Sequence, residues 1–178
     1  MTTIETPRLI LRRLTPTDMD AYYEAVFADA DVMRYLATRR PLPRDAFEAR
    51  IPAMMVDHWE QHGFGPWVII HKADERLIGH AGLRYWPDSS EVEVLYALTP
   101  ATWGQGFATE AAQASLRYGF DALGLDRIIA AAFAENVASR RVLEKCGMRD
   151  MGQFIWRDLE LIRYETRRPW PPTLQAAG

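Results

Sequence analysis

One stretch of this chain, residues 103–110, constrains the fold more than any other. It consists of Trp-Gly-Gln-Gly-Phe-Ala-Thr-Glu, and it follows an alternating apolar segment that ends at Leu98. A helix-forming run comes directly after the glycines. When a strand enters a small-residue loop that opens a helix, the first N–H groups of the helix have no partners, and the helix dipole adds partial positive charge. The stretch therefore predicts a phosphate-binding loop at a helix N-terminus.

The two glycines of this loop, Gly104 and Gly106, would let the main chain approach a ligand closely. They do not match two common phosphate loops. A dinucleotide-binding fold would have a third glycine at the position of Thr109, and its loop would follow the first strand of a parallel repeat. A nucleotide-triphosphate loop would contain Gly-Lys-Ser/Thr, and no lysine is nearby. An NAD-dependent oxidoreductase is therefore disfavoured.

Length and composition indicate a soluble, single-domain protein. The 178 residues can bury a full core, and no apolar run reaches membrane-spanning length. The net charge of −3 argues against general nucleic-acid binding. The single cysteine, Cys146, excludes an internal disulfide and fits a reducing cytoplasm. The histidines show no metal-ligand spacing, so we expect no metal site. The net charge and the short apolar runs lead us to expect no nucleic-acid and no membrane partner.

The first half of the chain is expected to start with a strand over residues 6–14. A helix start follows, with Thr15 as N-cap, Pro16 at the first helical position and Asp18 near the free N–H groups. A second helical stretch is predicted over residues 43–62, kinked or split at Pro52. A three-stranded meander then covers residues 67–71, 76–86 and 91–98.

Two helices and three strands complete the predicted chain. In order, they are a helix to Leu123, a strand over 127–133, a helix from Asn136 to Gly147, and strands over 153–156 and 159–166. The order β-α-α-β-β-β-α-β-α-β-β combines an antiparallel meander with one right-handed parallel crossover. We therefore expect an α+β fold (mixed α/β) whose central sheet is mixed and mostly antiparallel, with about seven strands and about four helices. One domain would cover residues 1–168, and a proline-rich tail, 169–178, would fray.

The glycine loop resembles the acetyl-CoA pyrophosphate loop of the GCN5-related N-acetyltransferase (GNAT) superfamily. Residues 124–128 (Gly-Leu-Asp-Arg-Ile) and 135–148 (Glu-Asn-Val-Ala-Ser-Arg-Arg-Val-Leu-Glu-Lys-Cys-Gly-Met) resemble the second half of that family. Residues 6–12 (Thr-Pro-Arg-Leu-Ile-Leu-Arg) are similar to the first strand of its RimJ/RimL-like branch. The resemblance covers most of residues 5–168 and implies a GNAT fold and a cytoplasmic, acetyl-CoA-dependent N-acetyltransferase.

Two positions depart from the general family pattern. Trp103 stands where many members have Arg or Gln, although the RimJ/RimL-like branch commonly has an aromatic residue there. Leu143 stands near the point where many members carry the tyrosine that protonates the leaving thiolate. This chain must supply that proton in another way.

The resemblance implies a cofactor site built mainly from the backbone. Main-chain groups of Leu98 and Thr99 would contact the pantetheine arm and the acetyl carbonyl, where one preorganised N–H is worth about 3 kcal/mol in the transition state. Asn136 would cap its helix and also contact the pantetheine arm. The residues implied for the pyrophosphate loop are Trp103, Gly104, Gln105, Gly106, Phe107, Ala108 and Thr109.

Two residues are candidates for the proton transfers of a direct attack by an amine on the thioester. Glu93 is the candidate base, because an amine is mostly ammonium at neutral pH and a glutamate recurs at this point in the family; the alternative is a solvated strand face. Ser139 lies one turn beyond Asn136 and is the candidate acid; the alternative is a buried serine bonded to a helix carbonyl. The lesser candidates are His80, Asp158 and Glu160. Cys146 lies on the apolar stripe of its helix, which indicates core packing.

The acceptor stays open between a protein N-terminal amine and a small amine such as an amino acid, a polyamine or an antibiotic. Tyr35, residues 34–44 and some of the large aromatic residues are expected to line its site. A non-catalytic module that binds acyl-CoA is the alternative function. Homodimers are frequent in the family, but no feature of this sequence demands one.

Overall fold

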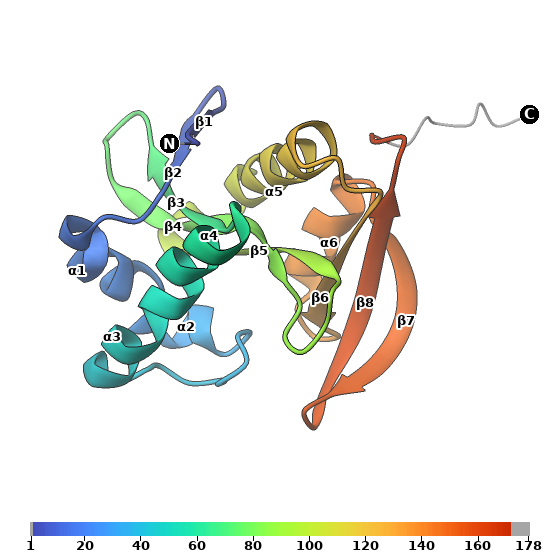
Figure 1. Cartoon of the computed structure of the whole chain (residues 1–178). Coiled ribbons are helices and arrows are strands. Elements are labelled where there is room, and N and C mark those ends of the chain that lie inside the picture. Colours follow the sequence, from blue (N-terminus) through green and yellow to red (C-terminus); the bar gives the residue numbers. More distant parts are fainter. Residues whose placement is uncertain (1, 172–178) are drawn as a thin grey trace, which may run out of the picture.

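The computed structural model describes residues 2–171, and Figure 1 shows the arrangement of the elements. Eight strands form one sheet in the order β1-β2-β3-β4-β5-β6-β8-β7. The strands are β1 (Ile4–Glu5), β2 (Leu9–Arg12), β3 (Pro66–His71), β4 (Leu77–Tyr85), β5 (Val92–Leu98), β6 (Arg127–Phe133), β7 (Arg149–Trp156) and β8 (Leu159–Arg167). Every neighbouring pair is antiparallel except β5 and β6, which are parallel.

The helices are α1 (Met19–Tyr22), α2 (Ala30–Met33), α3 (Arg44–Pro52), α4 (His58–His62), α5 (Phe107–Arg117) and α6 (Val137–Lys145). Wider, π-helical turns continue α1, α3 and α5 at Tyr23–Phe27, Ala53–Asp57 and Tyr118–Ala122. Pro52 has no N–H to donate, so the helix widens there and continues into α4. The segment ends at Gly63, whose φ of 73° is left-handed.

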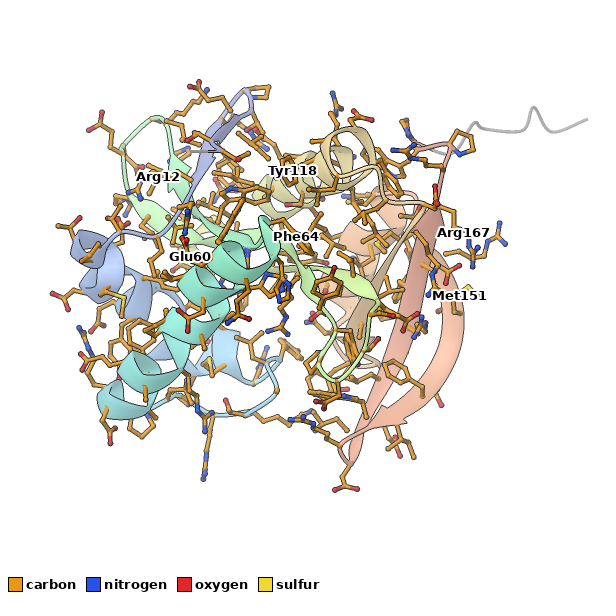
Figure 2. All side chains as sticks on the ribbon, in the orientation of Figure 1. Arg12, Glu60, Phe64, Tyr118, Met151 and Arg167 are labelled. Carbon is orange, nitrogen blue, oxygen red and sulfur yellow. The ribbon has the colours of Figure 1, made fainter. Side chains whose placement is uncertain are left out.

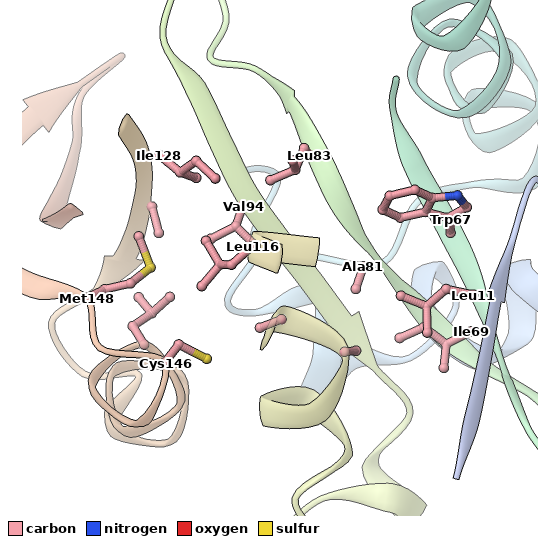
Figure 3. Close-up of a cluster of buried hydrophobic side chains, with 14 of the residues drawn as sticks. Leu11, Trp67, Ile69, Ala81, Leu83, Val94, Leu116, Ile128, Cys146 and Met148 are labelled. Carbon is pink, nitrogen blue, oxygen red and sulfur yellow. The ribbon is translucent and has the colours of Figure 1, made fainter. Parts of the chain in front are cut away.

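The helices cover both faces of the sheet (Figure 1). Strand alternation sends neighbouring side chains to opposite faces, so Trp67 and Ile69 pack under α5 while Val68 packs under α1 and α3. Figure 3 shows the larger core, on the α5 and α6 side. Its labelled members are Leu11, Trp67, Ile69, Ala81, Leu83, Val94, Leu116, Ile128, Cys146 and Met148.

The sheet opens between its two parallel strands. β5 and β6 pair at one position, Glu93 opposite Ile129, whereas β4 and β5 pair along their full length. Glu91, just before β5, accepts hydrogen bonds from Arg127 on β6 and Arg163 on β8. This cluster joins the strands at one end, and beyond Glu93 they separate.

The predicted fold class and element order are confirmed. The sheet has one strand more than expected, because Ile4–Glu5 folds back as β1 onto β2, at the far edge from β7. In Figure 2, Arg12 and Glu60 lie towards the β1–β2 side, while Met151 lies on β7. Within residues 2–171, no helix is long and apolar enough to cross a membrane.

The expected fraying of the tail is wrong at its start. The Trp170 indole Nε1 donates to the Cys146 carbonyl at 2.9 Å, and its ring stacks on Phe120 at 5.9 Å between centroids. Burial of a large aromatic surface holds this residue on the domain. The rest of the predicted tail, residues 172–178, lies outside the described residues.

Candidate active site

The opening between β5 and β6 leads into a cavity of about 490 Å³. One end reaches residues 102–109 and α6. The other end reaches α2 with the residues after it, and the ends of β4 and β7. A volume of this size suits a small organic ligand. The cavity therefore connects the two faces of the molecule at the one place where the strands separate.

The loop before α5 forms the first end of the cavity. Gly104 has a φ of 74° and Gly106 a φ of 82°, a left-handed conformation that glycine adopts without strain. In the part of the chain that the structure describes, the amides of Gly104, Gln105 and Gly106 donate to no protein group. The first amides of α5 also have no helical partner. The predicted phosphate loop thus has the local geometry that binding anionic oxygens requires.

Arg8 holds this loop against the start of the sheet. Its Nη1 donates to the Gln105 carbonyl at 2.8 Å, and its Nε pairs with Glu110 at 2.7 Å. The guanidinium also lies over the Phe107 ring, 4.2 Å from the centroid. Arg8 therefore anchors the glycine loop to the first strands, a role that the sequence pattern alone did not indicate.

Leu98 and Thr99 present different backbone groups to the cavity. The Thr99 N–H donates to the Ile78 carbonyl of β4 at 2.8 Å, so it is not free to bind a ligand. Donors alternate between the two sides of an antiparallel strand, so the Leu98 N–H points away from β4, into the opening. The Leu98 carbonyl, on the same side, accepts from Trp103 Nε1 at 2.8 Å. Trp103 thereby ties the loop to the end of β5.

α6 places two predicted residues beside the opening. Asn136 caps the helix, because its side-chain oxygen accepts from the Ser139 N–H at 3.1 Å, and both residues line the cavity. The Ser139 hydroxyl lies 2.9 Å from the Tyr96 hydroxyl and bonds to no helix carbonyl within residues 2–171. Burial raises the pKa of Tyr96, although the hydrogen bond with Ser139 opposes this.

Tyr96 is a cavity residue that the sequence reasoning missed. It occupies an alternating apolar position of β5, which is typical of core tyrosines. Its partner Ser139 lies 43 residues further along the chain, so only the fold brings the two hydroxyls together.

Glu93 is buried, so the alternative of a solvated strand face is wrong. Its side chain is on the α1–α3 side of β5, and Oε1 accepts from Arg84 Nε at 2.6 Å. Within residues 2–171, no fully buried side-chain oxygen lacks a partner, and Oε2 has none in the protein, so Oε2 contacts the cavity. Burial raises the pKa of Glu93, and Arg84 partly offsets the shift.

The lesser candidates differ in position. His80 lines the cavity, and its Nδ1 is 2.8 Å from the Tyr22 hydroxyl. Burial, with a smaller effect of Arg84, lowers the pKa of His80 to about 3, so the ring is neutral. Asp158 and Glu160 are exposed at the β7–β8 hairpin and do not line this cavity.

Aromatic side chains form the wall at the second end. Trp86 and Trp156 meet edge-on at 5.1 Å between centroids, and Tyr35 lines the same space. The residues after α2 are held there because Arg39 pairs with Glu135 at 3.0 Å, at the end of β6. Other large aromatics, such as Trp59 and Trp67, belong to the core.

Cys146 packs in the core, as its place on the apolar stripe of α6 predicted. Burial raises the pKa of the thiol to about 12, so it is protonated at neutral pH. A thiol in this state is a poor nucleophile.

Comparison with known proteins agrees with this geometry. A family model described as "Acetyltransferase (GNAT) domain" matches residues 8–149. The chain is 34% identical over 150 residues to the Bacillus subtilis (strain 168) protein "Uncharacterized N-acetyltransferase YoaA", covering 84% of both chains.

Solved structures show the same fold. An acetyltransferase (GNAT family) from Bacillus anthracis has a TM-score of 0.79 and 28% identity, with 93% of this chain and 98% of that chain covered. Mycobacterium smegmatis RimJ, solved in complex with CoA-disulfide, has a TM-score of 0.74 and 20% identity, with coverage of 92% and 84%. At that identity, the second likeness concerns the fold alone.

Proposed function

The chain belongs to the GNAT acetyltransferase family, and on that premise we propose that it moves an acetyl group from acetyl-CoA directly to a primary amine, without an acyl-enzyme. The observation that carries the proposal is the single cavity that joins the loop of residues 104–109 to Glu93. The buried and protonated Cys146 also favours direct attack. We further propose a cytoplasmic protein of the RimJ/RimL-like branch, on the similarity of residues 6–12.

The residues present fit acetyl-CoA as a co-substrate. The free amides of residues 104–109 would bind the pyrophosphate, with Trp103 closing the loop. The Asn136 side chain would hold the pantetheine arm. The Leu98 N–H faces the opening and would stabilise the oxygen of the attacked carbonyl, as an oxyanion-hole donor does. The Thr99 N–H already donates to the Ile78 carbonyl, so the Leu98 N–H is the better candidate for this donor.

Two partly buried polar pairs would transfer the protons. Glu93 accepts a proton from the ammonium form of the acceptor through Oε2, and the neutral nitrogen attacks the thioester carbon. As the carbon–sulfur bond breaks, the Ser139 hydroxyl donates a proton to the departing thiolate. The Tyr96 hydroxyl, 2.9 Å away, can return a proton to Ser139, and solvent then restores the proton of Tyr96. This route replaces the tyrosine that is absent at Leu143. The attacking nitrogen releases its remaining excess proton to solvent as the amide forms.

The deciding experiment combines binding with turnover. Acetyl-CoA at about 100 times its Kd should stabilise the protein by about 2.7 kcal/mol, a shift of roughly 5 to 10 °C in Tm, with NAD and ATP as controls. Thiol release should then occur with at least one primary amine. Binding with no thiol release from any amine would instead support a non-catalytic acyl-CoA module. A larger shift with NAD would overturn the assignment of the loop.

A further inference from the structure

We propose that the acceptor is a free α-amino acid with an apolar side chain, and that Arg84 binds the carboxylate that lies next to its amine. The inference rests on the proposed acetylation of an amine and narrows its acceptor. It follows from the charges, the donors and the aromatic wall at the end of the cavity where β4 and β5 lie side by side.

The charges argue against a polycationic acceptor. Within residues 2–171, Glu93 is the only carboxylate that lines the cavity, and Arg84 already pairs with it. The other charged lining residues, Arg141 and Lys145, are cations on α6, on the loop side of the sheet. A polyamine or an aminoglycoside could place one ammonium group at Glu93 but would have to bury its other cations with no second carboxylate to meet them, which is costly.

The Arg84 guanidinium has N–H groups that no described residue accepts. Its Nε donates to Glu93, while Nη1 and Nη2 bond to no other described residue. Its side chain lines the cavity and is 30% exposed. A guanidinium carries its N–H groups in a planar fork that matches the two oxygens of a carboxylate. His80, which also lines the cavity, is neutral and adds no competing charge.

The separation of these two groups selects an α-amino acid. Glu93 and Arg84 are opposite each other across β4 and β5 and are in direct contact at 2.6 Å. A ligand that offers its amine to Glu93 and an anion to Arg84 must therefore carry the two groups close together. An ω-amino acid with a long spacer does not fit.

The aromatic wall completes the site. Trp86, just after the end of β4, lines the cavity together with Arg84 and meets Trp156 at 5.1 Å between ring centroids. Both rings and Tyr35 line the cavity. An apolar or aromatic amino acid side chain would bury its surface there.

The test measures thiol release from acetyl-CoA with three matched acceptors: phenylalanine, phenylalanine amide and phenethylamine. Charge-assisted hydrogen bonds should make kcat/KM for phenylalanine about tenfold to a hundredfold higher than for the other two. Spermidine and the dipeptide Phe-Ala serve as the polycation and the peptide N-terminus. Both should be poorer acceptors than phenylalanine by at least about tenfold.

Variants then assign the preference to Arg84. Arg84→Lys keeps a positive charge beside Glu93 but loses the planar fork, so kcat/KM for phenylalanine should fall about tenfold more than kcat/KM for phenethylamine. The change with phenethylamine measures the effect of the variant on Glu93 alone. Arg76→Ala, at a remote and exposed arginine, should change neither. Tm and acetyl-CoA affinity confirm that each variant folds.

The remaining outcomes separate the two levels of the proposal. A preference for phenethylamine, spermidine or the dipeptide would overturn the amino acid acceptor while leaving amine acetylation intact. An equal loss with phenylalanine and phenethylamine in Arg84→Lys would also overturn it, because Arg84 would then act only through Glu93. Binding of acetyl-CoA with no turnover of any acceptor would overturn the proposed function itself.

Discussion

At the scale of single residues, two partly buried polar pairs distinguish the cavity from the apolar core around it. Glu93 pairs with Arg84, and Tyr96 pairs with Ser139. Each pair joins β5 to another element. Such groups are costly to bury unless they are hydrogen-bonded, and here their remaining polar atoms meet the cavity.

Glu93→Gln should lower kcat/KM about a hundredfold or more near neutral pH. Only the ionised carboxylate accepts a proton, and burial raises its pKa, so wild-type activity should rise as pH increases through that raised pKa. The variant should lose this rising limb in a pH–rate profile. Glu160→Gln, at an exposed glutamate, is the matched control. Equal losses in both variants would contradict the role of Glu93.

Ser139→Ala and Tyr96→Phe should each lower kcat about tenfold, with little change in acetyl-CoA affinity. Because the two hydroxyls act as one proton route, the double variant should lose much less than the product of the single effects. Steady-state thiol release measures this. Independent, multiplicative losses would show that the hydroxyls do not act together.

At the scale of the elements, the site depends on two anchors outside it. Arg8 ties β2 to the loop before α5, and Glu91 ties the starts of β5 and β6 to β8. The first anchor shapes the phosphate loop. The second closes one end of the opening and leaves the other end free.

Arg8→Ala should raise the KM for acetyl-CoA about tenfold and leave kcat within about twofold. The variant loses the hydrogen bond to Gln105 and the ion pair to Glu110, each worth about 1 to 2 kcal/mol at most at this exposure. Initial rates over a range of acetyl-CoA concentrations measure it. Arg117→Ala, at the exposed far end of α5, is the control; an unchanged KM in Arg8→Ala would refute the anchor.

Glu91→Gln should lower the free energy of unfolding by about 1 kcal/mol at neutral pH. The Arg163 hydrogen bond is the largest influence on the pKa of Glu91 and lowers it, against burial and together with Arg127. A depressed pKa contributes stability above the unfolded value of 4.5, and this contribution is lost as pH falls through the folded value.

Urea unfolding at several pH values should therefore show the difference between wild type and Glu91→Gln closing in acid. Glu24→Gln, at an exposed glutamate on the first helical segment, should match wild type throughout. If the stability difference between wild type and Glu91→Gln persists at pH values below the folded pKa of Glu91, the charge of Glu91 is not what stabilises this end of the sheet.

At the scale of the whole molecule, two cores flank a sheet that is interrupted at one position. β5 and β6 share a single paired position, so the opening exposes backbone groups in the middle of the protein. A ligand that fills the opening would replace the missing strand contacts. Binding and stability are therefore coupled through the cavity.

Acetyl-CoA should slow amide hydrogen exchange most at Leu98 and in residues 104–109, where free N–H groups would gain partners. The β1–β2 edge should change little, and it provides the internal control. Mass spectrometry of exchanged peptides measures both regions. Equal protection everywhere would indicate global stabilisation without this site.

The sequence by itself determined what depends on neighbouring residues. The Thr15–Asp18 helix start and the Asn136 cap are local preferences that the sequence predicts, and the structure has both. The alternation of β5 also placed Glu93 on the opposite face from Val92 and Val94. Backbone dihedral limits and unpaired N–H groups act over a few residues, so local sequence is enough to predict them.

Only the tertiary structure decided what depends on distant partners. It brought Tyr96 to Ser139, Arg8 to the glycine loop and Trp170 to Phe120, and it buried Glu93 where a solvated strand face was the alternative. Burial and the choice of a hydrogen-bond partner depend on which surfaces pack together. No local pattern specifies that packing, because the same residue types serve equally well on an exposed face.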